Sequence, residues 1–290
     1  MFETVLIPSD LFTPVTSFPA CFQGAPSLGV QRAVLVHPLP KQALGGAASL
    51  LRGLALPPLE EQRKKLEALG LTVAVETPEG DPVQMILDTA YREKADLIAV
   101  SRFSPGLFQE FLVHPLADGL LHQARHPLLG LGCGGSEVPA CRPLDQVFGG
   151  RILWATDFSR CAAAGFALLE RIVARTGAEA VLFHVQERGR LLPHVEARLS
   201  EFDRTDRERL EALAERLRSA GSRAVTCEVE LGRAGPTIVE KARSFFATLV
   251  VLGTQGRDWT EELLVGSVAH HVARHAPSPV LLVPGRGDAA

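Results

Sequence analysis

In the second half of the chain, short continuous apolar runs alternate with longer segments in which apolar residues recur every three or four positions. The apolar runs predict five strands, at Ile152–Thr156, Ala180–Val185, Ala224–Leu231, Thr248–Leu252 and Pro279–Val283. The periodic segments predict helices near Cys161–Thr176, Val195–Ala220, Thr237–Phe246 and Glu262–His275. Continuously apolar strands that alternate with helices are typical of a parallel sheet covered by helices on both faces.

The first half repeats this order, with predicted strands at Thr4–Pro8, Ala33–His37, Leu71–Glu76, Leu97–Ser101 and Leu128–Leu131. Its first helix is the exception. The residues that follow the first strand include Pro14, Pro19, Gly24, Pro26 and Gly29. Proline and glycine both disfavour a helix interior, so we expect no long regular helix there.

The two halves are an internal repeat. The same 147 positions separate Asp10 from Asp157 and His37 from His184, and later landmarks such as Pro127 and Pro279 are 152 positions apart. We therefore predict two tandem α/β domains, each a doubly wound parallel sheet, at residues 1–132 and 150–286. Glycine and proline between them, at Gly134, Gly135, Pro139 and Pro143, predict a linker at residues 133–149.

Composition excludes several classes of protein. Thirty Lys and Arg against 33 Asp and Glu give a net charge of -3, which is not the basic excess of a nucleic-acid-binding domain. There is neither an apolar run of about 20 residues nor a basic signal sequence, so we expect a cytoplasmic protein without a membrane span. Five cysteines without a C-x-x-C pair suit a reducing compartment better than a disulfide framework or a zinc site.

The segment after the fourth predicted strand of the second half carries the most specific pattern. Gly253, Gly256 and Gly266 are spaced as G-x2-G-x9-G, and Ser267 follows at the start of a predicted helix. Glycines let the backbone approach a ligand closely and adopt positive φ. The free N–H groups that open a helix favour an anion. The lysine of the G-K-[ST] phosphate-binding loop is missing, so this is a different kind of loop.

Asp157 ends the first strand of the second half, at the same rim of the predicted sheet. A carboxylate there can accept hydrogen bonds from ribose hydroxyls. Alternatively, Asp157 or Ser159 caps the following helix, and the loop glycines only shape turns. A pair of histidines, His270 and His271, together with His275 could bind zinc, although an exposed helix face explains them more simply.

The glycine pattern, followed by VAHHVARHAPSPVLLVP, resembles the ATP-binding subgroup of the universal stress protein family. The resemblance covers both halves and is strongest over Arg151–Pro284. It implies an adenine nucleotide alpha hydrolase-like, Rossmann-like fold that holds ATP, with or without Mg²⁺. The residues implied to bind adenosine, ribose and phosphates are Ala155, Thr156, Asp157, Val185, Leu252, Gly253, Gly256, Gly266, Ser267 and Val268.

The first half departs from this pattern. Ser101, Ser104, His114 and Pro115 stand where the second half has Gly253, Gly256, Gly266 and Ser267. Pro115 lacks the N–H that would face a phosphate. Asp10 is retained. We therefore expect a degenerate first domain that keeps its fold, with nucleotide held by the second domain alone.

These observations favour a nucleotide-binding stress-response protein, not an enzyme. The alternatives are a slow ATPase or nucleotidyl transferase, for which no general base or phosphate lysine follows from the pattern, and a nucleotide-free scaffold. The expected partners are an adenine nucleotide and, within the chain, the other domain. Neither nucleic acid nor membrane is expected.

Each half ends in a short apolar strand, and an edge strand invites pairing with another edge. Members of the resembling family commonly dimerise through their last strands. We expect the two halves to satisfy each other in the same way as a pseudo-dimer, while a further homodimer of the full chain stays open. The isolated second domain, Gly150–Ala290, should then self-associate at tens of micromolar in sedimentation, and a stable monomer would contradict this expectation.

Overall fold

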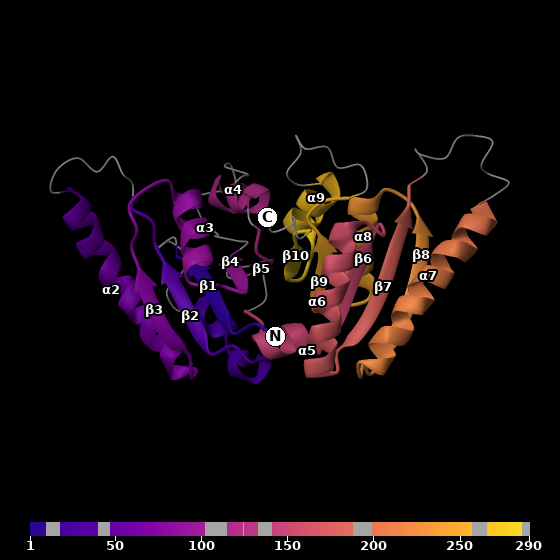
Figure 1. The fold of residues 1–290 in the computed structure, drawn as a ribbon, viewed down its shortest axis with the longest axis horizontal. Coiled ribbons are helices and arrows are strands. Elements are labelled where there is room, and N and C mark those ends of the chain that lie inside the picture. The colour runs from indigo at the N-terminus through magenta and orange to yellow at the C-terminus, as the bar shows by residue number, and fades with distance from the viewer. Residues whose placement is uncertain are drawn as a thin grey trace. The chain divides into compact units, whose positions relative to one another are not determined.

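The computed structural model describes residues 1–9, 18–39, 47–101, 115–123, 125–132, 141–187, 199–256 and 266–285. The chain divides into two compact units, Met1–Gln146 and Val147–Ala290, which we describe separately (Figure 1). Outside the described residues lie three positions of the first half that the sequence analysis compared with the second half: Asp10, Ser104 and His114.

The first unit is one parallel sheet with the strand order β3-β2-β1-β4-β5. Its strands are β1 (Thr4–Pro8), β2 (Arg32–Val36), β3 (Thr72–Glu76), β4 (Leu97–Ser101) and β5 (Leu128–Leu131). Its helices are α1 (Phe18–Cys21), the 3-10 helix η1 (Ala25–Leu28), α2 (Ala47–Ala68), α3 (Pro82–Arg92) and α4 (Pro115–Gln123). The short α1 and η1 agree with the expectation that proline and glycine prevent a long helix after β1.

The second unit repeats this architecture with the order β10-β9-β6-β7-β8. Its strands are β6 (Arg151–Thr156), β7 (Glu179–Gln186), β8 (Val225–Leu231), β9 (Leu249–Gly253) and β10 (Val280–Val283). Its helices are α6 (Arg160–Thr176), α7 (Leu199–Ser219), α8 (Ala234–Ser244) and α9 (Ser267–His275). The fold class predicted from the sequence, two tandem doubly wound parallel sheets, is confirmed; the pairing of the halves stays a prediction.

The strand order of the second unit places a reversal of winding at its centre. The chain proceeds from β6 outward to β7 and β8, then returns to β9 on the other side of β6. Right-handed crossovers therefore place α6 and α7 on one face and α8 and α9 on the other, and each pair of helices is in contact. At the carboxyl ends of β6 and β9 the chain continues to helices on opposite faces of the sheet, and such a point of reversal is where these sheets bind ligands.

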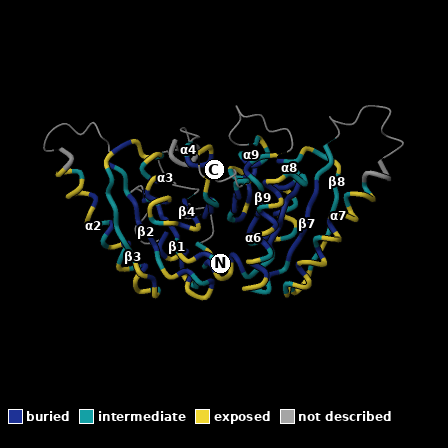
Figure 2. The backbone as a smooth tube through the Cα atoms, viewed as in Figure 1, coloured by how far each residue is buried: buried dark blue, intermediate teal, exposed yellow. Residues whose placement is uncertain are grey.

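Burial follows the layers of each unit (Figure 2). The central strands are dark blue in that view, while the helices turn exposed residues outward. In the second unit Trp154, Leu182 and Phe183 are buried in the sheet, and Leu169 and Ile172 of α6 cover it. Because both faces of β6, β7 and β9 are covered, their apolar runs are continuous instead of alternating.

The start of α8 differs from the sequence expectation. α8 begins at Ala234, three residues before the predicted start, since Pro236 occupies the third position of its first turn, where an N–H is not needed. The amide of Ala234 donates instead to the Glu187 carboxylate at 3.2 Å. α9 is described from Ser267 onward, so the predicted helical residues 262–265 lie outside the described part of the chain.

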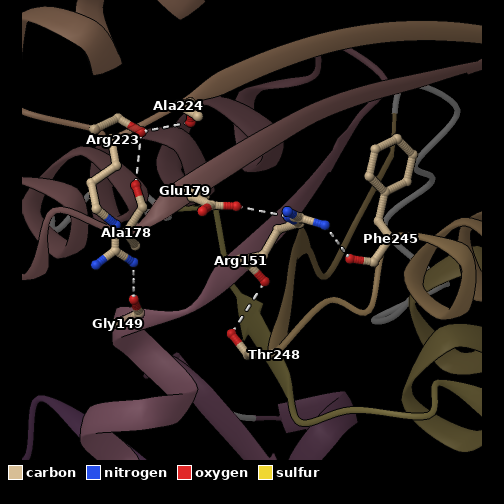
Figure 3. Close-up of polar contacts among 9 residues, drawn as sticks. Gly149, Arg151, Ala178, Glu179, Arg223, Ala224, Phe245 and Thr248 are labelled. Carbon is tan, nitrogen blue, oxygen red and sulfur yellow. Dashed lines mark hydrogen bonds and ion pairs between the residues drawn. The ribbon is translucent and has the colours of Figure 1, made fainter.

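The predicted linker is not wholly irregular, because it contains α5 (Leu144–Gly149). Leu144, Val147 and Phe148 are buried, and their i, i+3, i+4 spacing is a helix signal that the neighbouring glycines and prolines obscured. In the second unit the end of α5 is fixed by polar contacts around the amino ends of the strands (Figure 3). Arg223 donates to the Gly149 carbonyl at 2.6 Å, and Thr248 donates to the Val147 carbonyl at 2.9 Å.

Arg151, at the start of β6, contacts the start of β7 and the end of α8 at the same place. It donates to the Glu179 carboxylate at 2.8 Å and to the Phe245 carbonyl at 2.9 Å (Figure 3). These contacts lie at the edge of the sheet opposite to the carboxyl ends of the strands, so they hold the fold together and are not part of the candidate site.

The expectation that the cysteines are unpaired is wrong for two of them. Cys21 at the end of α1 and Cys141 before α5 form a disulfide, with Cα atoms 5.1 Å apart, which is within the usual range. Sequence spacing could not reveal this pair, because 120 residues separate the two positions. Cys161 and Cys227 are free, and burial together with the Glu211 carboxylate raises the pKa of Cys227 to about 12. No helix among the described residues has the length and apolar character needed to cross a membrane.

Candidate functional site

The loops after β6 and β9 meet at the reversal point of the second unit. The Ser159 hydroxyl lies 3.4 Å from the Gln255 carbonyl oxygen, and the Cys161 thiol lies 3.6 Å from the Gln255 side-chain oxygen. A Cβ added at Gly256 would lie 2.9 Å from a carboxylate oxygen of Asp157. Residues that are nearly one hundred positions apart in the sequence are thus brought to one rim of the sheet.

Asp157 is the first residue after β6 and is half-buried. One of its carboxylate oxygens accepts the amide of Ser159 at 3.0 Å, which closes a tight turn. Ser159, not Asp157, caps α6, since its hydroxyl accepts the amide of Ala162 at 3.2 Å. Between them Phe158 has φ of 60°, a left-handed conformation that costs a non-glycine residue roughly 1–2 kcal/mol.

The loop glycines do not adopt the positive φ that we expected. None of Gly253, Gly256 and Gly266 is among the residues with positive φ, so this prediction is wrong. The requirement is space instead. A Cβ at Gly253 would lie 2.8–3.0 Å from atoms of Cys161 and Ala162 in the first turn of α6, and at Gly256 it would meet the Asp157 carboxylate.

Gly266 differs from the other two glycines. It precedes α9 with φ of -71° and ψ of 144°, an extended conformation that any residue adopts. The nearest described atom to an added Cβ is the Thr254 carbonyl oxygen at 3.5 Å, which is an ordinary contact. Among the described residues, neither backbone conformation nor space explains a glycine at this position.

The amino end of α9 is suited to bind an anion. Gly266 donates its amide to the Thr254 carbonyl at 2.8 Å, which holds the helix start beside the loop after β9. The N-cap residue of this helix is Gly266, which has no side chain to cap it, whereas the N-cap residues of α6 and α3 are a serine and an aspartate whose side chains accept helix amides. Ser267 is exposed and Val268 is partly exposed. The amides of the first turn are therefore suited to a negatively charged group.

The remaining predicted site residues form the walls of this rim. Ala155 and Leu252 are buried within β6 and β9, and Thr156 is the last residue of β6. β7 continues beyond the end of β6: Thr156 pairs with His184, while Val185 pairs onward with Glu230 of β8. The backbone of Val185 therefore lies one residue past the last pair between β6 and β7, where a ligand can approach it.

Sequence reasoning missed two participants in this arrangement. Gln255 contacts both Ser159 and Cys161, and the imidazole of His184 lies beneath the turn, with Nδ1 2.7 Å from the Thr156 carbonyl oxygen. The repeat itself gave a signal for the histidine, because His37 of the first unit makes the same contact with the Ser9 carbonyl at 2.7 Å.

The zinc hypothesis gains no support from the described residues, in which no group of three or more His, Cys, Asp or Glu side chains could hold a metal ion. The rings of His271 and His275 stack with centroids 4.3 Å apart. Burial, together with the positive charges nearby, lowers the pKa of His271.

Comparison with known proteins agrees with this architecture. The model of the universal stress protein family matches residues 1–130 and 150–284. A universal stress protein of Mycolicibacterium smegmatis is 26% identical over 229 residues, which cover 76% of this chain and 71% of that protein. A crystal structure of a universal stress protein from Archaeoglobus fulgidus superimposes with a TM-score of 0.71 at 23% identity, covering 98% of each chain.

A putative universal stress protein from Pseudomonas aeruginosa UCBPP-PA14 superimposes with a TM-score of 0.66 at 18% identity, covering 98% of this chain and 93% of that one. At these identities the two crystal structures show the shared fold of the tandem chain.

Proposed function

The chain belongs to the universal stress protein family, and we propose that it acts through ATP binding by its second unit without enzymatic turnover. The observation that carries this proposal is Gly266 at the amino end of α9, where the described atoms leave room for a side chain and the sequence provides none. A phosphate that approaches this backbone would explain both features.

The described residues fit the proposed nucleotide. The amides that open α9, with the Ser267 hydroxyl, are suited to phosphates, and Gly256 leaves the Asp157 carboxylate uncovered at the rim. One oxygen of Asp157 accepts the Ser159 amide and so holds the turn, and the same carboxylate, at the rim of the sheet, is suited to accept ribose hydroxyls. Leu252 and Gly253 end β9 beside this point, and Val185 offers its backbone to the base.

The first prediction concerns stoichiometry. Pro115 is the first residue of α4, and Ser267 is the first residue of α9. Because proline lacks the N–H that serine offers at this place, we expect the first unit to bind no ATP and the chain to bind about one ATP. Calorimetry of the full chain measures this number, and two sites of equal affinity would contradict it.

Mass spectrometry of nucleotide released from the purified protein tests whether a nucleotide is bound at all, and its absence together with no binding in calorimetry would favour a scaffold. Phosphate release during repeated turnover would favour the ATPase alternative, provided that Gly266→Val abolishes it. We expect a bound nucleotide and no sustained turnover.

The second prediction concerns Asp157→Ala. Loss of the carboxylate removes a charge-assisted hydrogen bond to ribose, so the free energy of ATP binding should become less favourable by about 1–3 kcal/mol. Calorimetry with ATP and with a 2′,3′-dideoxy analogue measures the change. The analogue should bind the wild type and the variant almost equally, because it has no hydroxyls for Asp157 to hold.

Asp157→Asn is the matched control for the turn, because the amide oxygen still accepts the Ser159 amide. If Asp157→Asn and Asp157→Ala weaken the binding of the dideoxy analogue as much as that of ATP, the ribose role is wrong and Asp157 only shapes the loop.

A further inference from the structure

A buried polar cluster lies beneath the turn that presents Asp157. The His184 imidazole faces the Thr156 carbonyl with Nδ1, and its Nε2 lies 3.5 Å from a carboxylate oxygen of Asp206 on α7. Gln186 donates to the same Asp206 oxygen at 2.9 Å. The side chains of His184 and Asp206 are 9% and 15% exposed, so the imidazole is held at both ends largely out of water.

The cluster continues to the strained residue of the turn. The Phe158 ring packs against the His184 ring with centroids 4.8 Å apart. Arg209 lies one turn along α7 from Asp206. Its guanidinium lies 5.4 Å from the centre of the Phe158 ring and 3.7 Å from the Asp206 carboxylate. Two groups that contact the Phe158 ring, His184 and Arg209, therefore both contact Asp206 as well.

Asp206 stands on the face of α7 that covers the sheet. It belongs to the stripe that continues with the buried Leu210, Ala214 and Leu217. A carboxylate at such a position loses hydration, and an ion pair there is weak evidence for stability. An apolar residue would serve the packing of the helix as well, so the charge calls for another explanation.

The first unit supplies an internal comparison. Gly70 and Gly221 follow α2 and α7 in the same left-handed conformation, 151 positions apart, which aligns Asp206 with Ala55. The histidines align Gln186 with Leu39. Ala55 and Leu39 are buried, at 1% and 2% exposure. The first unit, which lacks the loop glycines, therefore has the histidine, but apolar residues stand where the second unit has Asp206 and Gln186.

We propose that Asp206 is a positioning residue for the nucleotide site, which acts through His184 to fix the turn Thr156–Ser159 and thereby orient Asp157. This inference rests on the proposed binding of ATP by the second unit. His184 with its carbonyl contact is a feature of the fold in both units, while Asp206 and Gln186 accompany the intact glycine loop.

The test compares the wild type with two variants. One is Asp206→Ala alone, and the other combines Asp206→Ala with Gln186→Leu and so copies the apolar pair of the first unit. We expect the double variant to unfold at a urea concentration no lower than the wild type, since the first unit folds with these residues. Both should bind ATP roughly tenfold more weakly, by analogy with the loss measured when a group that orients a metal ligand is removed. Glu208→Gln, on the exposed side of α7, is the matched control and should bind as the wild type does.

A second measurement does not depend on ATP. The amides of Phe158 and Ser159 donate to Thr156 Oγ1 at 2.9 Å and to Asp157 Oδ1 at 3.0 Å within the turn. Without Asp206 these two amides should exchange with deuterium faster, and the ring resonances of His184 should move in nuclear magnetic resonance spectra. Neither change is expected in Glu208→Gln.

The outcomes separate the two proposals. If the wild type binds no ATP, the proposed function fails, and with it the role of Asp206 toward a nucleotide, whatever the exchange data show. If the wild type binds ATP but the double variant binds it equally well, or if the two amides exchange at wild-type rates in Asp206→Ala, Asp206 is not a positioning residue and the inference is overturned.

Discussion

The variant Gly266→Val should lose ATP binding by at least about a hundredfold while the protein stays folded. The backbone at Gly266 is extended, and the described atoms around it leave room for a Cβ, so the fold itself accepts a side chain. A branched side chain would occupy the space in which a phosphate meets the backbone. The free energy of unfolding should fall by no more than about 1 kcal/mol, the cost of a poor residue before a helix.

Gly266→Asp is a sharper companion to this variant. Aspartate is among the best residues before a helix, so it should raise the stability of the second unit, yet its carboxylate would repel a phosphate at the start of α9. Calorimetry with ATP and urea unfolding measure both properties on the same samples. Retained affinity in either variant would remove Gly266 from the site and leave the glycine unexplained.

Most of the fold could be predicted from the sequence because the signals were local and strong. The buried strands are continuous apolar runs, and the offset that joins His37 to His184 shows that the order of elements is repeated. The carboxyl ends of β6 and β9 follow from that order, so the proximity of Asp157 and the glycine loop could be anticipated from topology.

What could not be predicted depends on contacts between distant residues. The disulfide between Cys21 and Cys141 requires knowing that α1 and the segment before α5 lie together. The helix α5 was hidden by glycine and proline on both sides. The role of each glycine could not be predicted from the sequence either. Gly253 is required because a Cβ would clash with α6, whereas the described atoms around Gly266 leave room for a Cβ, and a sequence pattern does not distinguish the two cases.

The carboxylate of Asp206 shows the same limit within the site. Charged residues occur along most of α7, and most of those that the structure describes are exposed. Asp206 differs from them, because its carboxylate faces inward and contacts Gln186 and His184, which lie on the preceding strand β7. A single inward charge among many outward ones has no periodic signature, and only the structure separates it from its neighbours.

The variant Gly253→Ala should do the opposite of Gly266→Val and damage the fold. A Cβ there would lie 2.8 Å from the Cys161 Cβ and 2.9 Å from the Cys161 carbonyl carbon, distances that real Cβ atoms essentially never show. Because the crowded atoms include the backbone of α6, a change of side-chain rotamer cannot relieve them. The second unit should lose about 1–3 kcal/mol of its free energy of unfolding.

Urea unfolding followed by the fluorescence of Trp154, which is buried in β6, measures this loss in the second unit. Gly149→Ala is the matched control, because among the described residues no atom beyond its own neighbours and helix backbone lies within 4 Å of a Cβ added there. ATP binding should weaken in Gly253→Ala as well, since displacement of α6 moves the turn that carries Asp157. A variant as stable as the wild type would mean that α6 and the end of β9 are farther apart than these distances show, and the close approach that joins the two loops of the site would be wrong.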